Sequence, residues 1–269
     1  MEAVDFSDQV VLVTGGSTGL GFAIAEAFGR AGAKIAVNDL APDRVERASA
    51  QLSAAGIICQ GFAADVRDAT AVRSMVDRIA TEMGIPDVTV ANAGIYPNTR
   101  FLDLSVEEWD RVLDTNLKGV FLTCQTVART LVSTNRAGQL VVIASGAANT
   151  AFWGWSHYCA SKAAVVMLTR AMALELGEHG IRVNALLPGY IDVPEGGAHL
   201  DEAYKSAART SIPIGRSGEP ADVARAVLML ASPLSGFVSG AAVAVDGGSG
   251  AGRFGIRPKA GPDETIAEG

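Results

Sequence analysis

The chain has 269 residues, of which 49% are hydrophobic and 19% charged, and its formal net charge is −7. This composition predicts a well-filled globular core, and the acidic balance without a basic stripe excludes nucleic acid as an expected partner. The three cysteines lack the spacing of metal ligands, so we expect no metal site and a reducing compartment. Because no secretory signal and no apolar run of ~18 residues occurs, we expect a cytoplasmic protein without a membrane partner.

Apolar runs alternate with amphipathic stretches along the chain. The runs predict strands at 9–14, 34–38, 57–63, 88–91, 140–144, 182–187 and 242–245. Helical periodicity covers 20–31, 42–55, 68–83, 105–132, 158–178 and 219–231. The alternation predicts an α/β fold, a single-domain doubly wound (Rossmann-type) seven-stranded parallel sheet with helices on both faces, over residues 1–250. Two stretches fall outside the rhythm, a substrate lid expected at about 189–213 and a C-terminal tail at 251–269.

A glycine-rich segment, Thr-Gly-Gly-Ser-Thr-Gly-Leu-Gly at 14–21, follows the first strand and opens a helix. Glycines at such a turn let backbone N–H groups approach a pyrophosphate at the N-terminus of the helix. The spacing Gly-x-x-x-Gly-x-Gly differs from the commoner Gly-x-Gly-x-x-Gly, but its place between strand and helix predicts dinucleotide binding. The residues expected at the phosphates are Gly15, Ser17, Thr18, Gly19, Leu20 and Gly21.

The next strand ends carry polar groups at the edge where open α/β sheets bind ligands. Asp39 ends the second strand, where a carboxylate can accept hydrogen bonds from ribose hydroxyls and repel a 2′-phosphate. No Arg or Lys lies in the glycine segment or directly after Asp39, which favours NAD over NADP; a solvated loop aspartate is the alternative. Further contacts are expected from Leu40, Asp65, Val66, Asn92, Ala93 and Gly94.

Tyr158 and Lys162 are one helical turn apart and therefore share a face of the helix predicted at 158–178. A lysine cation beside a phenol favours the phenolate, so we expect Lys162 to lower the pKa of Tyr158. A phenol with a lowered pKa can act as a general base on an alcohol. The spacing alone is weak, because it occurs on ordinary helices, but Ser145 ends an apolar strand just upstream.

The glycine segment, the triplet Asn-Ala-Gly at 92–94, Ser145 and the spaced Tyr158 and Lys162 together resemble the short-chain dehydrogenase/reductase family. The resemblance spans roughly residues 8–248 and implies that Tyr158 exchanges a proton with the substrate oxygen. It further implies that Lys162 contacts the nicotinamide ribose, that Ser145 hydrogen-bonds the substrate oxygen, and that Asn116 holds a water linked to Lys162. Asn116 and Ser145 could instead be caps at helix or strand ends.

Two positions depart from the family pattern. Ala91 stands where an asparagine is often found, and Val193 stands where a threonine often contacts the nicotinamide carboxamide. Backbone groups could substitute for that threonine. The resemblance therefore adds Tyr158, Lys162, Pro188, Gly189, Ile191 and Val193 to the expected NAD contacts.

Aromatic residues precede the catalytic tyrosine, and two of the three tryptophans lie between Ser145 and Tyr158. An aromatic wall with polar neighbours suits a carbohydrate ring; it equally suits a hydrophobic ketone or aromatic alcohol, and a subunit contact is the structural alternative. A histidine before the tyrosine and a C-terminal tail are similar to the family's bacterial sugar dehydrogenases. The residues expected to contact substrate are Tyr96, Ser145, Ala147, Trp153, Trp155, His157, Tyr158 and Glu195.

The sequence therefore predicts an NAD-dependent oxidoreductase that oxidises a hydroxyl of a sugar or polyol, with Tyr158 as general base. An NAD(P)H-dependent ketoreductase for acyl, steroid or secondary-alcohol substrates is the alternative, and a non-catalytic dinucleotide-binding sensor is a remote one. The resemblance also implies a homo-oligomer, a tetramer or a dimer, formed through the helices predicted at 105–132 and 158–178.

Overall fold

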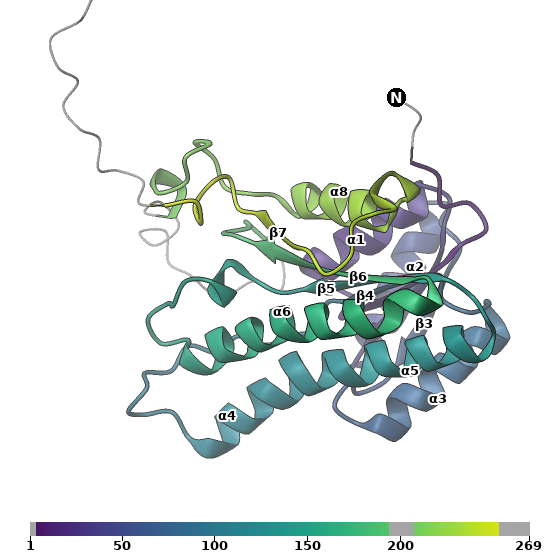
Figure 1. Ribbon diagram of the computed structural model, residues 1–269, viewed down its shortest axis with the longest axis horizontal. Helices are drawn as coiled ribbons and strands as arrows, with labels where there is room; N and C mark the ends of the chain where they lie inside the picture. The colour runs from purple at the N-terminus through teal and green to yellow at the C-terminus, as the bar shows by residue number, and fades with distance from the viewer. Residues whose placement is uncertain (1–3, 194–205, 207, 253–269) are drawn as a thin grey trace, which may run out of the picture.

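The computed structural model describes residues 4–193, 206 and 208–252. At its centre lies a parallel sheet of seven strands in the order β3-β2-β1-β4-β5-β6-β7 (Figure 1). The order changes direction between β1 and β4, which confirms the predicted doubly wound, Rossmann-type fold. The strands are β1 (Val10–Thr14), β2 (Lys34–Asp39), β3 (Cys59–Ala63), β4 (Val88–Ala91), β5 (Gly138–Ile143), β6 (Ile181–Pro188) and β7 (Ala242–Val245).

Helices cover both faces of the sheet, as the sequence predicts (Figure 1). One layer contains α1 (Gly19–Arg30), α2 (Pro42–Ala54) and α8 (Pro220–Ala231). The other contains α3 (Ala69–Glu82), α4 (Val106–Leu113), α5 (Gly119–Ser133) and α6 (Ser156–Leu176). Because strands joined by crossover helices run parallel, their carboxyl ends share one edge of the sheet, where the expected site residues are gathered.

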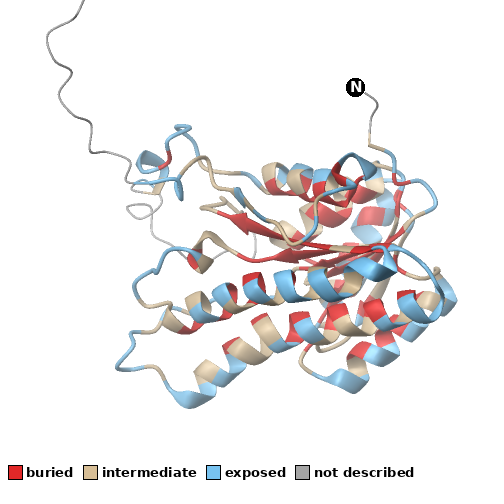
Figure 2. Ribbon diagram, viewed as in Figure 1, coloured by how far each residue is buried: buried red, intermediate tan, exposed pale blue. Residues whose placement is uncertain are grey.

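Burial on both faces explains why the central strands are largely apolar. All five residues of β1 are buried. Leu12 packs in the cluster that includes α3 and α5, whereas Val11 and Val13 pack in the cluster that includes α1 and α8. Each such side chain contributes roughly 1.5–3 kcal/mol of transfer free energy. Figure 2 shows the resulting pattern, with a buried sheet and helices exposed on their outer sides.

The helix predicted at 105–132 is interrupted in the structure. α4 ends at Leu113, and a π-helical turn, Asp114–Lys118, precedes α5. A π turn inserts a residue without unwinding the helix, so the apolar periodicity does not reveal it. The strand predicted from residue 57 begins at Cys59, because the Ile57 N–H still donates to the Leu52 carbonyl at the end of α2.

The expected lid and tail fall mostly outside the described residues. Of the lid, residues 189–193, 206 and 208–213 are described, and Ile191 forms a parallel bridge with Gly218. Of the tail, residues 251–252 are described. Within the described ranges, no helix combines the length and the apolar character needed to cross a membrane.

Candidate active site

The turn between β1 and α1 packs closely against the end of β4. Gly15 has a φ of 60°, and a Cβ atom at this position would lie 2.9 Å from the Ala93 Cα atom. Asn92 fixes the turn, since its Nδ2 atom donates to the carbonyls of Thr14 and Gly15 at 3.0 Å each. The glycine at position 15 is therefore required both by its backbone conformation and by its neighbours.

This turn fits a dinucleotide pyrophosphate. The first turn of α1 contains no acidic residue, so its N–H groups can receive an anion. The Ser17 Oγ atom is buried and has no hydrogen-bond partner among the described residues. A buried hydroxyl without a partner is the kind of polar atom that a ligand oxygen would satisfy.

Asp39 lies at the end of β2 with its side chain 9% exposed, and its carboxylate contacts Arg44 of α2. The Arg44 Nη2 atom lies 2.8 Å from Asp39 Oδ1, and the Ala41 N–H donates to the same oxygen at 3.4 Å. Arg44 was not predicted from the sequence, because it lies five residues after Asp39 and not directly after it. The sequence feature that could have indicated it is the position of Arg44 in the first turn of the helix that begins at Pro42. This position lets its side chain reach back to the end of β2.

Asp65 follows β3, and its carboxylate is paired with the nearby Arg67. Its two carboxylate oxygens accept hydrogen bonds from Arg67 at 2.7–3.0 Å. The hydrogen-bonded Arg67 guanidinium holds the pKa of Asp65 below its usual value. Asn38, which the sequence did not single out, donates from Nδ2 to the carbonyls of Phe62 and Ala64 at 3.0 and 3.1 Å. This amide joins the ends of β2 and β3.

Tyr158 meets Ser145 across the gap between α6 and the end of β5. The Ser145 side chain is near enough to the phenol to favour its ionised form and so to lower the pKa of Tyr158. The Ser145 Oγ atom also accepts from the Ala147 N–H at 3.1 Å, which caps the short 3₁₀ helix Gly146–Ala148. Ser145 is therefore an N-cap, as the alternative prediction had it, and the cap holds its hydroxyl in position beside the phenol.

Lys162 lies one turn along α6 from Tyr158 and is only 4% exposed. Its Nζ atom donates to the Ile143 carbonyl at 2.8 Å and lies 5.7 Å from the centroid of the Tyr158 ring. Burial lowers the pKa of Lys162 to about 8, because removal from water disfavours the ammonium form.

The expectation that Lys162 lowers the pKa of Tyr158 is wrong for the protein chain by itself. Burial raises the pKa of Tyr158, and the nearby Ser145 side chain opposes this rise only in part. The physical reason is that the Lys162 ammonium is directed at the Ile143 carbonyl. In addition, its pKa of about 8 means that it loses its proton at a lower pH than the phenol does. Desolvation of the phenolate therefore outweighs the attraction of the cation.

Asn116 occupies the π turn between α4 and α5 and is completely buried. Its Oδ1 atom accepts from the Ile95 N–H and its Nδ2 atom donates to the Ile95 carbonyl, both at 2.8 Å. Nδ2 also donates to Ser161 Oγ at 3.2 Å, and Ser161 Oγ donates to the Tyr158 carbonyl at 2.7 Å. Ser161 was missed in the sequence, where its signal was its place between the catalytic pair. The water proposed for Asn116 stays a prediction.

Gly94 brings this network close to the lysine. A Cβ atom at Gly94 would lie 3.3 Å from Asn116 Oδ1 and 3.7 Å from Lys162 Nζ. The absence of a side chain there therefore lets three elements meet, the loop after β4, the π turn and α6.

Aromatic residues expected on the substrate side take different positions. The ring of Tyr96 lies edge-on to that of Tyr158, with centroids 6.1 Å apart. Trp155 is half-buried, and its Nε1 atom donates to the Tyr96 carbonyl at 3.0 Å. Trp153 is 80% exposed, whereas Ala147 is buried. Tyr96 is thus beside the phenol, and Trp155 holds the Tyr96 backbone through its indole N–H.

His157 is not on the substrate side, which corrects the sequence prediction. Its side chain is 0% exposed, and its Nε2 atom lies 3.2 Å from Oε1 of Glu108 on α4. Neither ring nitrogen makes a hydrogen bond of regular geometry within the described residues. On a helix, adjacent residues point about 100° apart, so the residue before Tyr158 faces α4 rather than the phenol. Glu195, the other expected polar contact, lies outside the described residues.

The end of β6 lies against the end of β7. The Gly189 N–H donates to the Val245 carbonyl at 3.0 Å, and a Cβ atom at Gly189 would lie 2.7 Å from the Asp246 Cβ atom. Pro188 is the last residue of β6. Val193 is the last described residue before the gap, and its proposed contact with the nicotinamide, like that of Ile191, stays a prediction.

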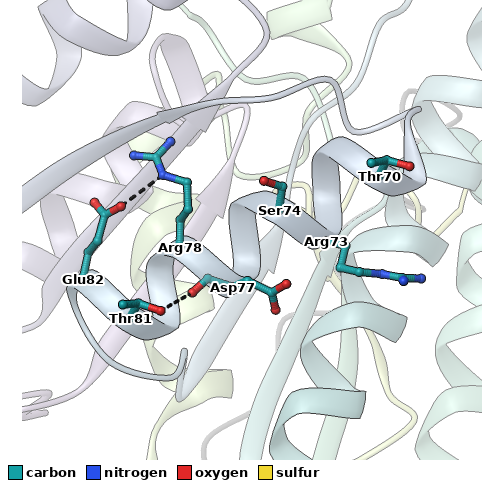
Figure 3. A pocket seen from close by; sticks show the side chains of 7 residues that line it. All are labelled: Thr70, Arg73, Ser74, Asp77, Arg78, Thr81 and Glu82. Carbon is teal, nitrogen blue, oxygen red and sulfur yellow. Dashed lines mark hydrogen bonds and ion pairs between the residues drawn. The ribbon is translucent and has the colours of Figure 1, made fainter.

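A surface hollow of about 390 Å³ lies elsewhere, along α3. Figure 3 shows that its lining residues all come from this one helix. They are Thr70, Arg73, Ser74, Asp77, Arg78, Thr81 and Glu82. None of them belongs to the strand ends, so the hollow is separate from the candidate active site.

Known proteins are similar to this chain in sequence and in fold. A family model described as enoyl-(acyl carrier protein) reductase matches residues 15–250. D-threitol dehydrogenase of Mycolicibacterium smegmatis is 37% identical over 250 residues, covering 91% of this chain and 96% of the relative. The chain belongs to the short-chain dehydrogenase/reductase family.

Further relatives of the family agree with this assignment. The (3R)-3-hydroxyacyl-CoA dehydrogenase of Mus musculus is 39% identical over 247 residues, covering 89% of this chain and 95% of the relative. The crystal structure of a short-chain type dehydrogenase/reductase from Mycobacterium marinum has a TM-score of 0.86 at 38% identity, covering 91% of this chain and 96% of that one. The protein is thus an oxidoreductase of CH–OH groups that uses a nicotinamide dinucleotide.

Proposed function

We propose that this short-chain dehydrogenase/reductase oxidises a hydroxyl group of a sugar or polyol, with NAD as its cofactor. The observation that carries the proposal is the meeting of Ser145, Tyr158 and Lys162 beside the glycine turn. In the proposed reaction the Tyr158 phenolate accepts the hydroxyl proton and Ser145 hydrogen-bonds the same oxygen. NAD, when bound, supplies the hydride acceptor, and the protein supplies orientation and proton transfer.

The other candidate residues have supporting roles in this proposal. Lys162 would contact the nicotinamide ribose, and its ammonium would help the phenol to ionise once the cationic nicotinamide ring adds its charge. Asn116 would keep the loop after β4 in register with α6, which its hydrogen bonds to Ile95 and Ser161 support. The buried Ser17 hydroxyl and the N-terminus of α1 would hold the pyrophosphate.

NAD is preferred over NADP in this proposal because of Asp39. A nearly buried carboxylate at the ribose position would repel a 2′-phosphate. The Arg44 guanidinium, 2.8 Å from the carboxylate, would be the group that receives a 2′-phosphate if Asp39 were removed. In the present geometry the guanidinium is engaged by Asp39, which leaves the second carboxylate oxygen for the ribose hydroxyls.

A sugar or polyol fits the aromatic and polar surroundings of Tyr158. Tyr96 presents a ring beside the phenol, on which the C–H face of a carbohydrate could pack. The similarity to a D-threitol dehydrogenase supports the same substrate class. A ketoreductase or dehydrogenase for acyl substrates is the second candidate, supported by the similarity to (3R)-3-hydroxyacyl-CoA dehydrogenase.

The test is a panel of tetritols, larger polyols, aldoses, simple secondary alcohols and 3-hydroxyacyl thioesters, with NADH formation followed by absorbance and the panel repeated with NADP. The proposal expects turnover of polyols or aldoses with NAD. Activity restricted to hydrophobic alcohols or thioesters would replace the sugar proposal with the second candidate. A preference for NADP would contradict the role proposed for Asp39 in binding the ribose hydroxyls and repelling a 2′-phosphate.

We also propose a cytoplasmic homo-oligomer, a tetramer or dimer. The three free cysteines suit a reducing compartment. Large apolar side chains on the outer sides of α5 and α6, Phe121, Met167 and Leu174, are exposed at 39%, 61% and 85%. Covering them with a second copy would remove apolar surface from water. Sedimentation of the purified protein tests this, and a monomer at micromolar concentration would contradict it.

A further inference from the structure

Two loops far apart in the sequence are cross-linked at the edge of the active site. We name them the rim: residues 95–99, after β4, and residues 152–155, before α6. The Trp155 Nε1 atom donates to the Tyr96 carbonyl at 3.0 Å, and the Asn98 Nδ2 atom donates to the Trp153 carbonyl at 3.1 Å. The Thr99 N–H donates to the Gly154 carbonyl at 2.8 Å. Three hydrogen bonds thus join the two loops within a few residues.

Gly154 lets the loops approach this closely. Its φ is 79°, a conformation that favours glycine, and a Cβ atom there would lie 2.5 Å from Asn98 Nδ2 and 2.8 Å from Asn98 Oδ1. A side chain at this position would therefore strain its own backbone and displace the Asn98 amide. The sequence did not single out Gly154 or Asn98, because the contact joins residues more than fifty positions apart.

Trp155 connects the rim to the catalytic helix. Its backbone carbonyl accepts from the Cys159 N–H at 2.8 Å, at the start of α6, while its indole holds the Tyr96 carbonyl. One residue therefore fixes both the helix turn that carries Tyr158 and the loop that carries Tyr96. The edge-on contact of the Tyr96 and Tyr158 rings, at 6.1 Å and 69°, is the geometry that results.

We propose that Trp155, Asn98 and Gly154 are positioning residues that hold the Tyr96 ring against Tyr158 and so set the space through which a substrate hydroxyl reaches the phenol. The inference rests on the proposed role of Tyr158 in proton transfer and is independent of whether the substrate is a sugar. The residues act through Tyr96, so their loss changes substrate handling and leaves the dinucleotide turn intact. Arg100, whose guanidinium carbon lies 5.8 Å from the Trp153 ring centroid, flanks the rim on its exposed side.

The experiment compares Trp155→Phe, Asn98→Ala and Gly154→Ala in the full-length protein. Trp155→Phe keeps an aromatic ring but removes the N–H donor. Gly177→Ala is the matched control, because that glycine has an ordinary φ of −60° and a Cβ atom added there would have no neighbour within 4 Å. The measurements are kcat and KM with whichever alcohol is oxidised, the Kd of NAD by fluorescence titration, and amide hydrogen exchange over residues 95–99 and 152–155.

The expected result is a rise in KM of roughly 3- to 10-fold for Trp155→Phe and Asn98→Ala, the range that the loss of one hydrogen bond produces. Gly154→Ala should have the largest effect, and combining it with Asn98→Ala should cost less than the sum, because the displaced amide is already absent. Exchange should accelerate in both rim segments of each variant, with the Kd of NAD unchanged and with Gly177→Ala behaving as the wild type.

Three results would overturn the assignment: unchanged exchange in the rim, faster exchange with unchanged kinetics, or an equal loss of NAD affinity that shows general damage to the fold. Hydrogen exchange needs no substrate, so failure of the rim is distinguishable from failure of the proposed function. A panel without sugar or polyol activity would remove the substrate class while the rim is tested with another alcohol.

Discussion

The Lys162 ammonium group lies 5.7 Å from the centroid of the Tyr158 ring and donates to the carbonyl of Ile143, on the strand behind it. No carboxylate is paired with this lysine among the ion pairs of the described residues. A buried cation held by a neutral carbonyl is costly, because a carbonyl recovers only part of the hydration that the ammonium loses. Function and stability are therefore opposed at this position.

Replacing the lysine with an apolar side chain of similar length should stabilise the fold and abolish activity. The lowered pKa of Lys162, to about 8 from 10.5, corresponds to about 3 kcal/mol at neutral pH, and the lost hydrogen bond to Ile143 offsets about 1 kcal/mol. We expect Lys162→Met to raise the free energy of unfolding by about 2 kcal/mol at pH 7. Urea unfolding measures the difference.

The pH dependence gives a sharper test of the same change. Below pH 8 the lysine is charged in both the folded and the unfolded protein, so the free-energy cost of burying it is full. As pH rises from about 8 to 10.5 this cost shrinks, because the folded protein already holds the neutral amine. Above 10.5 the lysine is neutral in both states and the cost is gone. The gain from Lys162→Met should shrink over the same interval. Lys118→Met, at an exposed lysine paired with Asp114, is the control and should change stability little. A less stable Lys162→Met protein at pH 7 would contradict the prediction.

Tyr158→Phe should remove catalysis and preserve cofactor binding. It deletes the hydroxyl that Ser145 influences but keeps the ring. General acid–base groups contribute roughly 10²- to 10⁴-fold to rates, so kcat should fall within that range while the Kd of NAD is retained. Retained turnover would assign proton transfer to another group, and a retained biological activity without turnover would favour the sensor alternative.

Oxidation should become faster as pH rises. The general base must be the phenolate, and burial raises the pKa of Tyr158 above its ordinary value of 10.0, so at neutral pH the phenol form dominates in the protein chain alone. We therefore expect kcat/KM for oxidation to increase with pH, and ultraviolet absorbance of the phenolate to appear at lower pH once NAD is bound, since its cationic ring favours the anion. A rate that declines between pH 7 and 9 would be inconsistent with this base.

Asp39→Ala should shift cofactor preference toward NADP. The change removes the carboxylate that would repel a 2′-phosphate and releases Arg44, now 2.8 Å from it. We expect the NADP-to-NAD ratio of kcat/KM to rise roughly tenfold or more, the worth of one charged hydrogen bond. Asp43→Ala, at an exposed aspartate paired with Arg47, is the control. Adding Arg44→Ala should reverse the gain; if it does not, the released guanidinium is not the cause.

The contact between His157 and Glu108 should contribute to stability rather than to substrate binding. Leaving the Glu108 carboxylate without a polar neighbour costs roughly 1–3 kcal/mol, so His157→Leu should lower the free energy of unfolding by about that amount. His157→Gln, which keeps a polar side chain facing Glu108, should lose less. Glu107→Gln, at the exposed neighbour, controls for charge. A raised KM with unchanged stability in His157→Leu would restore the direct substrate contact that the sequence predicts.

The fold was predictable because a strand that is buried on both faces is recognisable as a run of consecutive apolar residues. The strands β1, β4 and β6 are apolar over most of their length, and their positions in the sheet follow from the alternation with helices. The glycine turn and the spacing of Tyr158 and Lys162 are likewise local patterns, so they could be found without coordinates.

The missed features depend on distances between segments. The direction of the Lys162 ammonium depends on Ile143, and the burial of His157 depends on the packing of α4 against α6. Arg44 required knowledge of where α2 begins relative to Asp39. Sequence spacing gives the face of a helix that a residue occupies, but it does not say which other element covers that face.

The π turn at Asp114–Lys118 changes the direction in which the side chains of α5 point relative to those of α4. An extra residue in one turn rotates α5 by about 100° relative to a continuous α-helix grown from α4. The helix can therefore direct Glu108 at His157 in α6 before the turn and pack α5 against α3 after it. Deleting one residue of the turn would restore a regular α-helix. The α4 contact with α6 and the α5 contact with α3 could then not both be kept.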